Sequence, residues 1–190
     1  MRNLIEPLTV AYSTFDMIAD RITLWGNSGS GKSTLAEQMS LRFGLPALHL
    51  DKIAWTAGWA YADEPAFLEA HRDWIQRPRW IIEGVGHVSG IRQRFDRAEV
   101  IIHLDTPLEV CRRRAQVRLE EDRLRPNRFM AEGCRYAEVV EKQWEVIDYF
   151  DRCMRADIDH LIQTEFASKI RIRLDGSKST DELLAEIQNS

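Results

Sequence analysis

Residues 26–33 form a glycine-rich loop that ends in a lysine and a hydroxyl side chain. They match the pattern G-x-x-x-x-G-K-[ST] in full. Glycines let backbone N–H groups approach an anion closely, and the helix expected after the loop presents its positive end there. Lys32 would reach the β- and γ-phosphates of a nucleotide, and the Ser33 hydroxyl would ligate Mg2+. The predicted nucleotide-binding residues here are Gly26, Asn27, Ser28, Gly29, Ser30, Gly31, Lys32, Ser33 and Thr34.

Three acidic residues directly follow short apolar runs: Asp51, Glu83 and Asp105. Ligands of open α/β sheets bind at the carboxyl ends of the strands, and Mg2+ prefers oxygen ligands. We therefore predict a magnesium site formed by Ser33, Asp51 and Glu83. Asp51 has a second candidate role as the base that accepts the proton of a substrate hydroxyl. For Asp105, which a predicted helix cap follows at once, metal binding and a structural role both stay open.

Arginines are concentrated between positions 112 and 128, where there are seven. Arg114 and Arg118 are four residues apart, so they project from one face of a helix. Positioned arginines stabilise the charge that spreads over a phosphoryl group during transfer. We predict this role for Arg114 and Arg118. The alternative is a solvated basic face paired with the acidic residues at 120–122.

Aromatic and histidine side chains lie near these positions. Trp55 and Trp59 follow Asp51 in a loop, where they could line a substrate pocket or simply cover a small core. His49 and His103 fall within predicted strands, and we expect both to be structural.

These residues need a scaffold that brings strand ends together. Apolar strands are expected at residues 21–25, 47–50, 80–82, 100–104 and 169–174, and helices at 32–43, 64–76, 136–149 and 158–166. Thr106 and Ser179 each open a capping box and hence a further helix. Strands that are apolar throughout and alternate with helices indicate a parallel sheet covered on both faces. We therefore predict an α/β fold, a three-layer α/β/α domain with a mostly or fully parallel five-stranded sheet.

The composition of the chain limits which classes of function it can have. The chain has 190 residues and a formal net charge of −4, so a surface that grips nucleic acid throughout is not expected, although a local basic patch stays open. Three widely spaced cysteines without metal spacing indicate reduced thiols and a cytoplasmic protein. No run is long and apolar enough for a membrane span. Residues 1–20 make a poor signal peptide; they form an extension that is either ordered, disordered or an overlong start upstream of Met17.

The order of motifs resembles a known family. The segments GNSGSGKSTLA, LPALHLDKIAW, WIIEG, VIIHLDTP, an R-x-x-x-R pair and LDGSKSTDEL resemble those of adenylate-kinase-like P-loop kinases, and most closely the group called DNA topology modulation proteins. The resemblance extends over residues 21–187. It implies a P-loop NTPase core at 21–190 with a substrate-binding insertion at about 51–79. It also implies an arginine-rich lid at about 118–135 that closes over the phosphates.

The resemblance also implies ligands and roles. ATP and Mg2+ are the expected cofactors, with Glu83 in place of the aspartate that adenylate kinases hold near the magnesium waters. Arg114 and Arg118 match the arginine pair at the start of the lid, and Arg128 lies within it. The loop of Gly176, Ser177 and Lys178 resembles the one that packs on adenine. The catalytic residues so predicted are Lys32, Asp51, Arg114, Arg118 and Arg128.

One departure leaves the acceptor open. Adenylate kinases carry an arginine for the monophosphate after the third strand, whereas residues 84–87 here read Gly-Val-Gly-His. Arg92 or Arg94 could replace it. We predict a Mg–ATP-dependent phosphotransferase that acts on a small acceptor, nucleotides included, as a monomer or homodimer. The alternatives are an ATP-binding regulatory protein linked to DNA topology and an ATPase without an acceptor.

Overall fold

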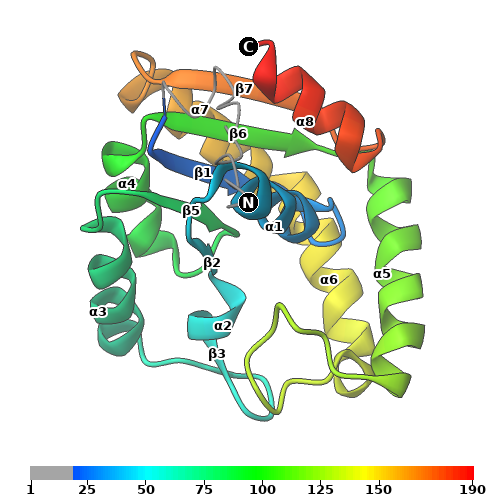
Figure 1. The fold of residues 1–190 in the computed structure, drawn as a ribbon. Helices are drawn as coiled ribbons and strands as arrows, with labels where there is room; N and C mark the ends of the chain where they lie inside the picture. The colour runs from blue at the N-terminus through cyan, green and yellow to red at the C-terminus, as the bar shows by residue number, and fades with distance from the viewer. Residues whose placement is uncertain (1–18) are drawn as a thin grey trace, which may run out of the picture.

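The computed structural model describes residues 19–190, so nearly all of the predicted N-terminal extension lies outside the described residues. Strands and helices alternate along the chain (Figure 1). The strands are β1 (Arg21–Trp25), β2 (Ala47–His49), β3 (Trp55–Thr56), β4 (Ala60–Tyr61), β5 (Trp80–Glu83), β6 (Val100–Asp105) and β7 (Ile170–Asp175). The helices are α1 (Lys32–Phe43), α2 (Asp51–Ala54), α3 (Glu64–Ile75), α4 (Val88–Arg97), α5 (Leu108–Leu124), α6 (Val140–Tyr149), α7 (Arg155–Glu165) and α8 (Thr180–Gln188), with a 3-10 turn η2 (Tyr136–Glu138) and a π-helical turn η3 (Phe150–Met154).

Within residues 19–190, the main sheet has five strands in the order β2-β5-β1-β6-β7. Every neighbouring pair in it is parallel. The prediction of a parallel five-stranded sheet is therefore confirmed. Strand β1 lies at the centre, with Ile22 beside Ile81 on one side and Val100 on the other. This order places the residues after β1 between the ends of β5 and β6.

Alternate residues of the strands face two separate cores. Leu24 and Ile102 pack with α1 and α8 on one face of the sheet. Trp25 and Ile101 pack on the other face with α3, α4 and the η3–α7 region. Successive side chains of a strand point to opposite faces, so strands that are apolar throughout need helices on both. The structure thus has the three predicted layers.

The start of α5 differs from its prediction. Thr106 does not cap this helix: Pro107 is its N-cap residue, and no side chain caps it. The Thr106 hydroxyl instead donates to the Ser30 carbonyl oxygen at 3.1 Å. The capping-box pattern predicts that this hydroxyl caps the helix, but in the structure it binds the buried Ser30 carbonyl of the neighbouring loop instead. The second capping box, at Ser179, is formed as predicted.

Further elements, the short helix α2 among them, were not expected from the sequence. Helix α4 follows β5, and the short antiparallel hairpin β3–β4 follows α2. Helix α5 also continues to Leu124, so the first residues of the predicted lid are helical rather than irregular. Residues 125–139, which connect α5 to α6 and include the rest of the predicted lid, are called the covering segment below; they lie beside the β3–β4 hairpin (Figure 1).

Two expectations from composition, reduced cysteines and no membrane span, can be compared with the described residues. All three cysteines, which lie within the described part of the chain, are free thiols. Across residues 19–190, the helices lack the length and hydrophobicity that a membrane span requires.

Candidate active site

The glycine-rich loop connects β1 to α1 and bends through conformations that favour glycine. Gly26 and Gly29 have φ angles of 152° and 78°. A Cβ atom on Gly26 would lie 2.6 Å from the Leu104 carbonyl oxygen, and one on Gly29 would lie 2.4 Å from that of Cys111. The loop is therefore packed directly against the end of β6 and the start of α5. Larger residues at either position would push the loop away from its supports.

Asn27 fixes this loop to a distant helix. Its Nδ2 donates to the Ile147 carbonyl oxygen of α6 at 2.9 Å, and its Oδ1 accepts from the Ser28 backbone N–H at 2.7 Å. The Lys32 ammonium group donates to the Asn27 carbonyl oxygen at 3.2 Å. The Lys32 side chain therefore lies over its own loop. An anion bound by the backbone N–H groups of this loop would contact the ammonium group there.

The two predicted lid arginines have different partners. Arg114 Nη1 donates to the carbonyl oxygens of Ser30 at 2.9 Å and Gly176 at 2.7 Å. Arg118 Nη2 donates to the Ser28 hydroxyl at 2.9 Å, and its guanidinium lies 4.1 Å from the centre of the Tyr136 ring. Arg114 therefore joins two backbone loops. Arg118 instead reaches a side chain on the outer part of the phosphate loop.

Glu83 is a buried carboxylate at the end of β5. It is 2% exposed, and its Oε1 lies 2.9 Å from His49 Nδ1 on the neighbouring strand β2. Its Oε2 has no hydrogen-bond partner among the described residues. Burial acts to raise the pKa of Glu83, but the hydrogen bond from His49 and the charge of Lys32 outweigh it and hold that pKa below its ordinary value. Glu83 is therefore a charged group with an unused oxygen.

Asp51 begins helix α2 and is separated from the end of β2 only by Leu50. Burial raises its pKa above the ordinary aspartate value, and the nearby charge of Glu83 adds to this effect. The charges of Lys32 and Arg118 act in the opposite direction. Asp51 therefore lies among the phosphate-loop lysine, the second acid and the lid arginine. A carboxylate with a raised pKa is better matched to accepting a proton near neutral pH than an ordinary one.

Arg128, predicted as catalytic, lies on the surface. Its side chain is 69% exposed and pairs with Glu37 of α1 at 2.5 Å. The next residue, Phe129, is half-buried and packs against His49, with ring centroids 4.7 Å apart. In this conformation it is Phe129 rather than Arg128 that contacts the strand-end residues.

Aromatic residues join the β3–β4 hairpin to the covering segment. Trp59 packs edge-on to Trp55 and against Tyr136, and its indole Nε1 donates to the Arg135 carbonyl oxygen at 2.8 Å. Leu119, Met130 and Cys134 complete this small core. Trp55 and Trp59 were predicted either to line a substrate pocket or to cover a small core, and the structure shows the second of these roles.

The loop after β7 lies next to the phosphate loop. The Gly176 N–H donates to the Asp105 carbonyl oxygen at 3.0 Å, and a Cβ atom on Gly176 would lie 1.8 Å from Thr106 Oγ1. Arg114 links this loop to Ser30, as described above. Ser177 donates to Asp175, and Lys178 pairs with Glu186 of α8. The predicted adenine loop is therefore held against the same strand ends by its backbone.

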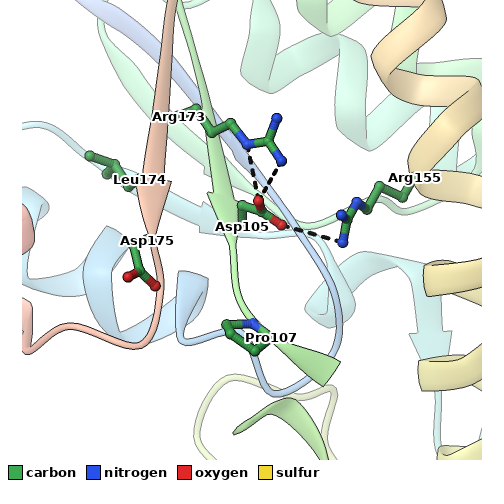
Figure 2. A pocket seen from close by; sticks show the side chains of 6 residues that line it. All are labelled: Asp105, Pro107, Arg155, Arg173, Leu174 and Asp175. Atoms are coloured by element: carbon green, nitrogen blue, oxygen red, sulfur yellow. Dashed lines mark hydrogen bonds and ion pairs between the residues drawn. The ribbon is translucent and has the colours of Figure 1, made fainter. Parts of the chain in front are cut away.

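The Asp105 carboxylate is already paired with two arginines. Arg173 donates to it with Nη2 at 2.5 Å, and Arg155 lies 3.4 Å away on the other side (Figure 2). These groups line an open pocket of about 500 Å³ with Pro107, Leu174 and Asp175. Of the two roles left open for Asp105, the structure shows the structural one.

The residues of the site fit a magnesium ion held mostly by phosphate and water. Residues 19–190 contain no group of three or more His, Cys, Asp or Glu side chains that could hold a metal by themselves. Mg2+ usually binds through one or two carboxylates together with substrate phosphates and waters. The unused Glu83 Oε2 is a buried acceptor of this kind, and the Ser33 side chain also interacts with Glu83.

Comparisons with known proteins identify the fold. No protein-family model and no curated protein sequence matches the chain. A sugar kinase from Janibacter sp. HTCC2649 is 18% identical over 89% of this chain and 92% of its own, with a TM-score of 0.52. Shikimate kinase from Acinetobacter baumannii, in complex with shikimate, is 16% identical over 90% and 91%, with a TM-score of 0.55. A gluconokinase from Sinorhizobium meliloti 1021 is 16% identical over 90% and 91%, with a TM-score of 0.53.

The chain therefore has the P-loop kinase-like fold. This confirms the fold class predicted from the motifs. His49, Phe129 and Gln143, which donates to the Ser28 hydroxyl at 3.1 Å, were not predicted as site residues. For His49 a signal was present: it lies two residues before Asp51, on the strand expected to end at the site.

Proposed function

We propose that the protein is a Mg–ATP-dependent phosphotransferase that transfers the γ-phosphoryl group to a hydroxyl of a small acceptor. One observation carries the proposal: Lys32 of the phosphate loop lies close enough to the strand-end acids Asp51 and Glu83 to lower the pKa of both, and the charge of Glu83 in turn raises the pKa of Asp51. The backbone N–H groups at Gly26–Ser33 would bind the phosphates, with Lys32 on the β- and γ-phosphates.

Each remaining side chain has a role in this proposal. Asp51 accepts the proton of the attacking hydroxyl. Arg118 stabilises charge on the transferred group, while Arg114 keeps the phosphate loop and the Gly176 loop together. Ser33, Glu83 and Asp51 would hold Mg2+, directly or through water. A bound Mg2+ would neutralise charge on the phosphate oxygens. The loop of Gly176, Ser177 and Lys178 would contact the base.

The two candidate arginines for an acceptor phosphate have other partners. Arg92 is exposed and pairs with Glu165. Arg94 is 1% exposed and donates to Thr23 Oγ1 at 2.9 Å and to the Gly84 carbonyl oxygen at 3.0 Å. This supports an acceptor that presents a hydroxyl rather than a phosphate. The sugar, shikimate and gluconate kinases of the same fold are named for acceptors of that kind.

The covering segment supports transfer over hydrolysis. It is attached to the β3–β4 hairpin by Trp59 and to α1 by Arg128, so it lies over the strand ends. Exclusion of water from a phosphoryl-transfer site favours the acceptor over water as the nucleophile. We propose that residues 118–135 act as the lid and that residues 51–79 form the acceptor-binding insertion.

The resemblance to DNA topology modulation proteins is part of the same proposal. Its distinctive segment includes His49, Asp51 and Trp55, which lie at the site or in its aromatic cover. We interpret this segment as part of a small-molecule kinase site.

The proposal is tested by a phosphorylation screen. The protein is incubated with Mg2+ and ATP labelled in the γ-phosphate, together with sugars, polyols, hydroxy acids and nucleosides, and the products are identified by mass spectrometry. We expect one acceptor class to gain phosphate, and Lys32→Ala to abolish the transfer without loss of fold. Phosphate release at one constant rate, whatever acceptor is added, would instead support an ATPase.

A further inference from the structure

His49 pairs with Glu83 but has no role in the phosphoryl transfer proposed above. They are register partners on the parallel strands β2 and β5, so their side chains project from the same face. His49 Nδ1 lies 2.9 Å from Glu83 Oε1. Since an ionised carboxylate only accepts hydrogen bonds, Nδ1 is the donor. The imidazole therefore fixes one oxygen of a carboxylate that is 2% exposed and leaves Oε2 available.

The covering segment holds the imidazole from the other side. The Phe129 ring packs on His49 with centroids 4.7 Å apart and an interplanar angle of 46°. Phe129 is flanked by two anchored residues: Arg128 pairs with Glu37 of α1, and Met130 Sδ accepts from the Tyr136 hydroxyl at 3.0 Å. A chain of contacts thus runs from the covering segment through Phe129 and His49 to Glu83.

We propose that His49 is a positioning residue that couples closure of the covering segment to the orientation of Glu83. When Phe129 lies on the imidazole, the ring is confined and Glu83 Oε2 is held toward the nucleotide phosphates. When the segment lifts, the imidazole gains freedom and the carboxylate loses its fixed direction. The inference rests on the proposed function, because it assigns Glu83 to the magnesium site. Partners of this kind around metal-binding groups typically contribute 10- to 100-fold to metal affinity.

The test measures binding rather than turnover. The affinity for a non-hydrolysable ATP analogue is determined by calorimetry in EDTA and in Mg2+, and the ratio of the two is the magnesium enhancement. The proteins are the wild type, His49→Ala, His49→Asn, Phe129→Ala and the double variant His49→Ala/Phe129→Ala. Asparagine keeps an N–H group near the position of Nδ1, so it is the conservative replacement.

We expect His49→Ala to reduce the magnesium enhancement about tenfold while affinity in EDTA changes less than about twofold. His49→Asn should retain most of the enhancement. Phe129→Ala should lose part of it, and the double variant should be no worse than His49→Ala, because the two residues act in series.

Three outcomes distinguish the alternatives. An unchanged enhancement in His49→Ala, or an equal loss in EDTA and in Mg2+, overturns the inference and leaves His49 with a packing role. If His49→Ala does not fold, Phe129→Ala decides, and an unchanged enhancement there overturns the coupling. Failure of the wild type to bind the analogue under either condition contradicts the proposed function itself.

Discussion

Arg118 donates a hydrogen bond to the Ser28 hydroxyl at 2.9 Å, whereas Arg114, one helical turn earlier, donates to two backbone carbonyls. The pair is therefore divided between two roles. Arg118 can exchange its partner for a phosphate, while the bonds of Arg114 hold two loops in place.

Methionine substitutions separate these roles. We expect Arg118→Met to lower kcat by about 10²- to 10³-fold, the usual cost of removing one donor that stabilises transition-state charge, with little change in thermal stability. Arg114→Met should instead lower the free energy of unfolding by about 2–3 kcal/mol, because it removes charged hydrogen bonds to Ser30 and Gly176. Denaturant melts and steady-state kinetics on both variants check this. Equal kinetic losses with unchanged stability would contradict the division.

Asp51→Asn tests the proposed base. General base catalysis typically contributes 10²- to 10⁴-fold, so we expect kcat to fall by about that factor. The pKa of Asp51 is raised, so its charged form is less stable in the folded protein than in the unfolded chain. The charge therefore destabilises the fold at pH values above the folded-state pKa. We expect Asp51→Asn to melt at a higher temperature than the wild type at pH 7.

The pH dependence provides the control for Asp51. The melting-temperature advantage of Asp51→Asn should shrink as pH falls through the raised pKa, because the wild-type carboxyl becomes neutral there. Glu83→Gln should show the reverse trend, since its pKa is lowered and its charged form is favoured by folding. An Asp51→Asn advantage that is constant from pH 4 to pH 8 would argue against the raised pKa.

Gly176→Ala tests the contact between the β7 loop and β6. The added Cβ would lie 1.8 Å from Thr106 Oγ1, which also donates to Ser30. Overpacking of this kind costs about 1–3 kcal/mol, so we expect the free energy of unfolding to fall by that amount. Adding Thr106→Ala removes the opposing hydroxyl and should restore part of the loss. Additive effects of the two substitutions in denaturant melts would mean that the residues do not touch.

Trp59→Ala tests the attachment of the covering segment. Its loss removes the bond to Arg135 and the ring contacts with Trp55 and Tyr136. A half-buried tryptophan of this kind should contribute about 2 kcal/mol, below the range for a fully buried one. Since about 2 kcal/mol corresponds to a roughly 30-fold change in the open population, we expect trypsin to cleave after Arg128 about 30-fold faster in the native variant. Trp74→Ala, on α3, is the matched control and should leave that rate unchanged.

The sequence was most informative where one local pattern dictates both conformation and chemistry. The loop at residues 26–33 requires a strand before it and a helix after it, so the fold and the position of Lys32 followed together. Strand-end acids could be predicted because parallel strands align their carboxyl ends. The predicted roles of Asp51 and Glu83 remain predictions, but the two residues lie on adjacent elements, since Leu50 N–H, next to Asp51, donates to the Glu83 carbonyl oxygen at 3.0 Å.

Other features depend on contacts between distant residues and leave little local trace. Thr106 had a good capping pattern, yet the Ser30 carbonyl, 76 residues away, competed for its hydroxyl. Arg114 and Arg118 look alike by spacing, and only their partners in the folded protein, the Ser30 and Gly176 carbonyls against the Ser28 hydroxyl, distinguish them. Helix α4 was missed because its glycine and charged residues obscure its apolar face; buried Gly90 there packs on Phe67.

The central position of β1 has a consequence for biosynthesis. Arg21 pairs with Trp80, and Ile22 pairs with Val100, so β1 leaves the ribosome before either of its neighbours in the sheet and stays unpaired until β5 and β6 have emerged. Non-local pairing of this kind slows folding and leaves apolar strands exposed in the meantime. The nascent chain should therefore depend on chaperones until residue 105 has emerged from the ribosome, and only then can it form a nucleotide-binding loop.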